Sequence, residues 1–282
     1  MKIITNILKF IVMTIIVLCL TFIGIKNIAF STILNKEYIT KKLNETNFYS
    51  ETYELVKLNF ENYIDQSGFN KDILENICTP EKVENDINTV LANIYDGKQE
   101  QIDTTEISDK LNANIDKKNI KNAKNSTAIE AFVKHICQSY KDTIISTKYD
   151  TIINNRYENI TQKLGKIEKI VITVLIINTI LLIILNIKNI LKILLNIQTI
   201  TLATSLFQFL TTIVITSNVK IEGIKVFNEA FSNTLVSIIK EIFNKINKFG
   251  IILLIIYVIF VIIYSIAIKI TKNNEQKENK EI

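Results

Sequence analysis

The chain has 282 residues, 48% of them hydrophobic, and a formal net charge of +5. Six glycines and one proline are few helix-breaking residues for this length, so we expect long helices and no β structure. The segment 26–168 holds 19 Lys and Arg against 22 Asp and Glu, so the positive surplus lies outside it. This distribution favours anionic lipid headgroups as partners and argues against nucleic acid, which would need a basic face on that segment.

The first apolar stretch, residues 8–25, approaches the length of about 20 residues that a helix needs to cross a bilayer. Residues 1–7 precede it and are expected to form a short cytoplasmic N-terminus. No small-x-small cleavage site follows the stretch. We therefore interpret it as an uncleaved signal anchor, the first transmembrane helix, and not as a cleaved signal peptide.

Residues 26–168 contain no further span, and we expect them to form an extracytoplasmic helical bundle between the first two spans. Their apolar residues recur at helical spacing, without the alternation typical of strands. One helix is expected to begin with Thr79 as N-cap and Pro80 in its first turn, and to end at Gly97. The expected buried faces comprise Tyr49, Tyr53, Val56, Phe60 and Tyr63; Val83, Ile87, Leu91 and Ile94; Ile107, Leu111 and Ile115; and Ile129, Phe132, Val133, Ile136 and Tyr140.

The last helix of this domain is expected to continue without a break into the second span, residues 169–187. No proline interrupts it, and Gly165 is the one point where it could kink. Two interpretations stay open. The helix either simply needs no break, or it transmits position or force from the domain to the membrane.

Two cysteines, Cys78 and Cys137, lie in the expected domain. They could form a disulfide in an oxidising exterior, or they could be two separate thiols in the core; their apolar helical neighbours favour separate thiols. The chain has no CxxC pair, and His135 is its only histidine, so we expect no metal site and no cofactor. GxSxG, HExxH, GxxxxGK and GxGxxG are also missing, and we expect no enzymatic activity.

The third span, residues 199–217, carries polar side chains along one helix face and follows a short cytoplasmic connection, residues 188–198. A polar amide in hydrocarbon needs a partner, so this face should point toward other helices. We expect it to hold helices together through hydrogen bonds, although it could instead be the wall of a hydrated path. The intramembrane polar stripe comprises Thr201, Thr204, Ser205, Gln208, Thr211 and Thr212.

Residues 218–249 are expected to form an exterior amphipathic helix, which either lies in the headgroup layer or packs against the domain. Residues 250–268 form the fourth expected span, and the polar residues 269–282 a disordered cytoplasmic tail. Lysines before the first span, between the second and third, and after the fourth place these regions inside by the positive-inside rule. Five lysines between the third and fourth spans oppose this orientation.

The sequence thus predicts an all-α protein: four transmembrane helices plus an extracytoplasmic helical bundle. One span, a large exterior domain and three further spans resemble, in topology, the FtsX and MacB class of bacterial permease-like proteins. The resemblance implies a partner ATPase that contacts a coupling element between spans 2 and 3, here residues 188–198. The exterior domain resembles the helical exterior domains of multi-pass membrane proteins from low-GC bacteria.

Our leading hypothesis is a non-enzymatic integral protein of the cell membrane whose exterior domain binds a protein partner or senses the cell surface. The alternative is a permease-like transmission subunit that works with a separate ATPase. The lipid bilayer is a partner in both. The identity of the protein partner and the number of copies in an assembly are left open.

Overall fold

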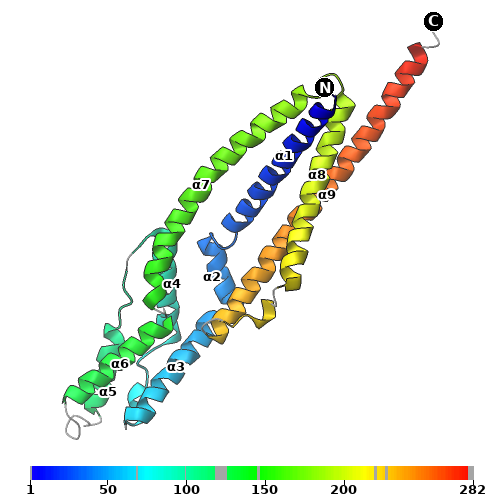
Figure 1. Ribbon diagram of the computed structural model, residues 1–282. Coiled ribbons are helices and arrows are strands. Elements are labelled where there is room, and N and C mark those ends of the chain that lie inside the picture. Colours follow the sequence, from blue (N-terminus) through cyan, green and yellow to red (C-terminus); the bar gives the residue numbers. More distant parts are fainter. Residues whose placement is uncertain are drawn as a thin grey trace. The chain divides into compact units, whose positions relative to one another are not determined.

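The computed structural model describes residues 2–67, 69–98, 100–117, 126–144, 147–218, 221–225 and 228–278. It is 88% helix, and no strand occurs in these described segments, as the sequence predicts. The helices are drawn in Figure 1. In chain order they are α1 (Lys2–Phe30), α2 (Lys36–Glu45), α3 (Phe48–Ser67), the 3₁₀ helix η1 (Lys71–Leu74), α4 (Pro80–Asp96), α5 (Thr105–Lys117), α6 (Ser126–Ile144), α7 (Thr147–Ile184), α8 (Ile190–Asn218), the 3₁₀ helix η3 (Ile221–Gly223) and α9 (Glu229–Glu278).

The chain divides into two compact units. The first, the span unit, comprises Met1–Thr32, Gln162–Ile224 and Ile238–Ile282. The second, the core unit, comprises Ile33–Thr161 and Lys225–Ser237. Helices α7 and α9 contribute residues to both units.

The core unit is built around one hydrophobic core, to which η1 and helices α2 to α6 contribute. Most of the faces expected from the sequence supply it. Two positions differ: Tyr63 is exposed and stacks on His135, while Ile64 is buried, and Asn93 is buried where Ile94 was expected. The side chains of this core that have no exposed surface are Val56, Ile73, Val83, Ile107, Leu111, Ile115, Ile136 and Tyr140.

Local signals set the limits of α4 as the sequence predicts. The Thr79 side chain accepts a hydrogen bond from the Lys82 amide, and Pro80 occupies the first turn, where its missing N–H costs nothing. The helix ends at Gly97, whose φ of 66° is a left-handed conformation that suits glycine. Asn93 then fixes the chain after the helix, because its side chain exchanges two hydrogen bonds with the backbone of Glu100.

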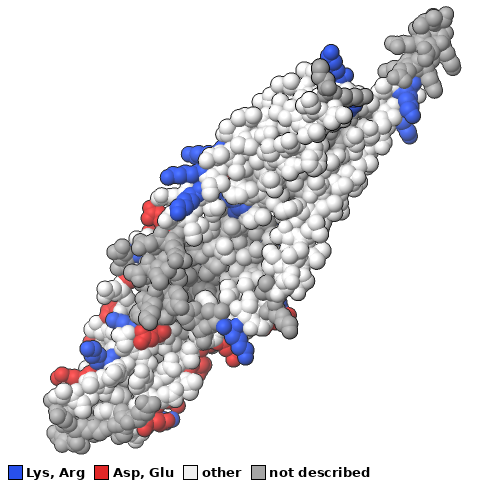
Figure 2. Space-filling model, viewed as in Figure 1, with Lys and Arg blue, Asp and Glu red and all other residues white. Residues whose placement is uncertain are grey.

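Among the residues that the structure describes, four helices are long and apolar enough to cross a membrane: Ile3–Phe30, Tyr157–Ile184, Ile190–Asn218 and Glu229–Asn273. The first, third and fourth expected spans fall within them, whereas the second was expected to reach residue 187 and its helix ends at Ile184. On the face drawn in Figure 2, the surface over α1 and the apolar parts of α7 and α8 is almost uncharged, with lysines at its margins. Such a surface is compatible with a multi-pass membrane protein.

Two helices extend beyond the limits expected from the sequence. The segment 188–198 was expected as a connection, but α8 begins at Ile190, so only five residues, 185–189, separate α7 from α8. The segment 218–249 was expected as a separate amphipathic helix, but it enters α9, which continues through the fourth expected span to Glu278. Residues 269–278 are therefore helical, whereas the sequence suggested disorder, and 279–282 lie outside the described residues.

The physical reason is the same at both places. A helix that is already nucleated gains one hydrogen bond for each added residue, and the Lys, Glu and Gln residues of these segments are good helix formers. A single glycine, Gly250, does not interrupt α9. At both places the sequence changes between polar and apolar residues, but the helix continues through the change.

Candidate functional site

The polar stripe of α8 lies largely in the interior of the span unit. Thr204, Ser205 and Gln208 have no exposed surface, and Thr201 and Thr212 are also buried. Thr211 is only half-buried. One further member, Gln198, was not expected from the sequence and is buried too. The buried positions 198, 201, 205, 208 and 212 follow alternating steps of three and four residues, the spacing of a helix seam.

Two side chains of the stripe connect α8 to α9. Ser205 donates a hydrogen bond to the Gly250 carbonyl oxygen at 2.8 Å, and Gln198 donates one to the Phe260 carbonyl oxygen at 3.0 Å. The threonine hydroxyls behave differently, because Thr201, Thr204 and Thr212 each donate to a carbonyl one turn earlier in α8. Only part of the stripe therefore acts between helices.

Gln208 is the exception within the stripe. Its side chain is fully buried, yet neither Nε2 nor Oε1 has a hydrogen-bonding partner among the residues that the structure describes. The Thr21 hydroxyl of α1 is buried without such a partner as well. An amide brought out of water without compensating hydrogen bonds costs several kcal/mol, on the order of 4–8 in a fully apolar medium.

Two glycines let three helices approach each other near this amide. A Cβ at Gly250 would lie 3.2 Å from the Phe209 ring and 3.4 Å from Cβ of Gln208. A Cβ at Gly24 would overlap the ring of Phe249, the residue before Gly250 in the chain. Helices α1, α8 and α9 thus meet in one layer around Gln208.

A Gly24→Ala variant should lower the free energy of unfolding of the full-length protein by about 1–3 kcal/mol, because the Phe249 ring has to move. The matched control is Gly165→Ala, also inside a helix, where the added Cβ meets no atom within 4 Å. That variant should raise stability by about 0.5–1 kcal/mol. Unfolding in mixed detergent micelles measures both, and equal effects would contradict the close contact at Gly24.

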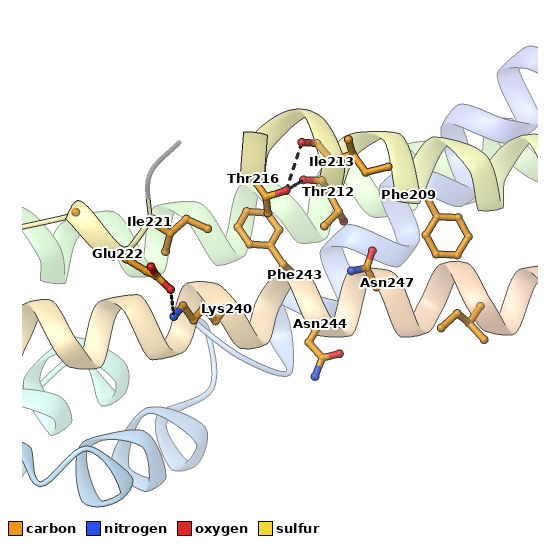
Figure 3. A pocket seen from close by; sticks show the side chains of 12 residues that line it. Phe209, Thr212, Ile213, Thr216, Ile221, Glu222, Lys240, Phe243, Asn244 and Asn247 are labelled. Carbon is orange, nitrogen blue, oxygen red and sulfur yellow. Dashed lines mark hydrogen bonds and ion pairs between the residues drawn. The ribbon is translucent and has the colours of Figure 1, made fainter. Parts of the chain in front are cut away.

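A cavity of about 1130 Å³ lies beside this layer, between α8 and the first half of α9 (Figure 3). Phe243 and Asn247 point from α9 toward α8, whereas Asn244 points away, and an ion pair joins Lys240 to Glu222 at 2.9 Å. The lining therefore combines apolar side chains with an equal share of polar ones, among them a neutralised charge pair. Its residues are Phe209, Thr212, Ile213, Thr216, Ile221, Glu222, Gly223, Lys240, Phe243, Asn244, Asn247 and Ile251.

The core unit carries a smaller groove of about 440 Å³ between α5 and α6. Hydroxyl and amide groups line it together with one acidic and one basic side chain. Its residues are Thr104, Thr105, Ser108, Asn112, Glu130, Val133, Lys134 and Cys137. A groove with groups of both charges and many hydrogen-bonding side chains suits a polar peptide segment better than an apolar ligand.

Cys78 and Cys137 are free thiols at the edge of the core. Burial raises the pKa of Cys78 to about 12, and burial also raises the pKa of Cys137 above its usual value. Both side chains therefore stay protonated at neutral pH, which makes them poor nucleophiles. Each thiol lies near a backbone carbonyl, that of Thr79 for Cys78 and that of Thr104 for Cys137.

The described residues contain no group of three or more His, Cys, Asp or Glu side chains that could hold a metal ion. His135 lies against Tyr63, with ring centroids 6.2 Å apart. Comparison with models of known protein families, with curated proteins and with solved structures gave no match.

Proposed function

We propose that this chain is a non-enzymatic multi-pass protein of the cell membrane. Its core unit lies outside the membrane and binds a protein partner. Binding tilts or shifts helices that continue into the span unit, and the span unit responds to this movement. The observation that carries the proposal is that α7 and α9 each continue from the core unit into the span unit without a helix break. A continuous helix is stiff enough to carry a tilt or a shift from one unit to the other.

Helix α7 has contacts on both sides of the unit boundary. In the core unit, the Tyr157 hydroxyl donates to the Leu34 carbonyl oxygen, and its ring packs edge-on against Tyr95 with centroids 4.8 Å apart. In the span unit, Glu168 accepts a hydrogen bond from Lys26 of α1 at 2.9 Å. Glu168 lies eleven positions after Tyr157, a helix length of about 16 Å.

Helix α9 repeats this arrangement. In the core unit, the hydroxyls of Thr234 and Thr46 lie 2.6 Å apart. In the span unit, Lys245 donates to the Ser31 carbonyl oxygen at 3.1 Å, and the Gly250 carbonyl accepts from Ser205. Displacing one end of α9 would therefore disturb contacts at the other end.

The outside position of the core unit is part of the proposal and is supported by the lysines before the first span, between the second and third, and after the fourth. The partner would bind along the groove between α5 and α6, where Glu130 and Lys134 offer both charges. Such a surface supports recognition of a polar segment of another protein.

The proposal can be tested in lipid nanodiscs with the full-length protein labelled by a polarity-sensitive fluorophore at Thr216→Cys, in a background without native cysteines. Antibody fragments that bind the core unit should shift the emission of this label. Three glycines inserted after Gly165 and after Ser237 should abolish the shift while the fragments still bind. Binding without any shift, or an equal shift in the insertion variant, would contradict transmission through the helices.

The permease-like alternative needs a surface on which an ATPase can dock between α7 and α8. That connection has only five residues, 185–189, and its Lys188 and Asn189 are exposed. So short a connection offers little room for a coupling element. We therefore favour the receptor-like function.

A further inference from the structure

We propose that the cavity between α8 and α9 binds a zwitterionic phospholipid, with an acyl chain in its apolar end and the headgroup at the ion pair of Lys240 and Glu222. The residues that line this cavity all belong to the span unit. The site goes beyond the proposed receptor function and depends only on the span unit lying in a bilayer.

The two ends of the cavity differ in polarity. At one end the Phe209 ring lies over Gly250, and Ile251 completes the lining. Phe209 and Ile251 belong to the third and fourth expected spans. At the other end, shortly after α8 ends, the ion pair of Lys240 and Glu222 closes the lining. The cavity therefore changes from apolar to charged toward the end of the spans, as a lipid does from chain to headgroup.

The size of the cavity suits a lipid chain. Ile251 lies eleven positions after Lys240 in α9, a helix rise of about 16 Å. One leaflet supplies about 15 Å, half of a hydrocarbon core of about 30 Å. The volume of about 1130 Å³ exceeds the range of about 300–1,000 Å³ that is typical of small-molecule pockets. Ile213 and Ile251 line the cavity and are 59% and 48% exposed, so a lipid can enter it from the side.

The charges at the polar end favour a headgroup that carries both signs. Nζ of Lys240 lies 2.9 Å from Oε1 of Glu222, and the two side chains are 54% and 82% exposed. Exposed ion pairs contribute little stability, so this pair can open at low cost. Lys240 then binds the phosphate and Glu222 binds the ammonium group, which leaves every charge paired. An anionic lipid without an ammonium group would leave Glu222 unpaired.

Asn247 adds a polar contact between the two ends. It lines the cavity and points from α9 toward α8 (Figure 3). Its amide offers two N–H donors and lies about two turns further along α9 than Lys240. The ester carbonyls of a lipid whose headgroup is bound at Lys240 can accept from these donors. A single ion would instead pair with one charge, release the other and leave the apolar end empty.

The chain has no tryptophan, so a single introduced Trp reports lipid contact through quenching by brominated phospholipids. Phe243→Trp places this reporter in the cavity lining. Phe207→Trp is the matched control, because Phe207 is 44% exposed on α8 and does not belong to the described lining.

The full-length variants would be placed in nanodiscs of phosphatidylglycerol with a minor share of brominated phosphatidylethanolamine. Quenching at position 243 should then exceed that at position 207 at least severalfold. With brominated phosphatidylglycerol as the minor lipid in phosphatidylethanolamine, the order should reverse. Equal quenching at the two positions in both mixtures would overturn the lipid site.

A Glu222→Gln substitution tests the role of the ion pair, because it leaves Lys240 without its carboxylate partner. It should lower quenching at position 243 by brominated phosphatidylethanolamine, raise quenching by brominated phosphatidylglycerol, and leave position 207 unchanged. Strong quenching at position 243 that ignores the headgroup, or that Glu222→Gln leaves unchanged, would overturn the assignment of a zwitterionic lipid.

Native mass spectrometry of the protein without substitutions gives a measurement that does not depend on the folding of the Trp variants. After extraction from the phosphatidylglycerol nanodiscs into a mild detergent, the chain should retain a single phosphatidylethanolamine. A chain that retains no phospholipid, or only phosphatidylglycerol, would contradict the proposal.

Discussion

A Gln208→Glu variant is expected to lose about 3 kcal/mol of stability, whereas Gln208→Leu should stay within about 1 kcal/mol of the native protein. Leucine removes the unpaired donor and acceptor together and has a similar size. A carboxyl group at this fully buried position would have to stay protonated or disturb the helices around it.

Thermal or detergent-induced unfolding of the full-length variants measures this difference. Ser205→Ala is a useful reference, because it removes a bonded hydroxyl from the same face and should cost about 1 kcal/mol. A Leu variant as unstable as the Glu variant would show that the Gln208 amide makes specific bonds that the packing depends on.

A Leu111→Ala variant should destabilise the core unit by about 2–5 kcal/mol. Leu111 is fully buried on α5, within the core formed with η1 and α6, so its loss leaves a cavity in the core. The matched control is Leu58→Ala on α3, which should change stability by less than about 0.5 kcal/mol, because Leu58 is 55% exposed.

The core unit's unfolding in the full-length protein can be followed through the reactivity of the half-buried thiol of Cys78, which becomes more accessible when the core opens. Leu111→Ala should lower the denaturant concentration at which Cys78 reacts, and Leu58→Ala should not. Similar effects of the two substitutions would mean that Leu111 is not part of a packed interior.

The sequence predicted well those features that depend on local periodicity. The spacing of Ile107, Leu111 and Ile115 is enough to define a buried face, and the Thr79–Pro80 pair with Gly97 is enough to delimit a helix. Both signals come from residues within a few positions of each other. The four apolar stretches were equally clear, because length and composition alone define them.

The features that the sequence did not reveal depend on contacts between distant residues. The close approach at Gly24 requires Phe249, more than two hundred residues further along the chain. Gln198 was missed because it lies before the expected third span, although its partner is the Phe260 carbonyl inside the fourth. Gln208 was expected to find a partner, and only the packing shows that its amide has none among the described residues.

The most direct test of the proposed function is the side of the membrane on which the core unit lies. Single cysteines at Lys98, which is exposed in the core unit, and at Asn273, near the end of α9, would be introduced into a background without native cysteines. An impermeant thiol reagent applied to intact cells should modify position 98 and leave position 273 unmodified until the cells are lysed. Labelling of position 273 with protection of position 98 would place the core unit in the cytoplasm and contradict an exterior receptor.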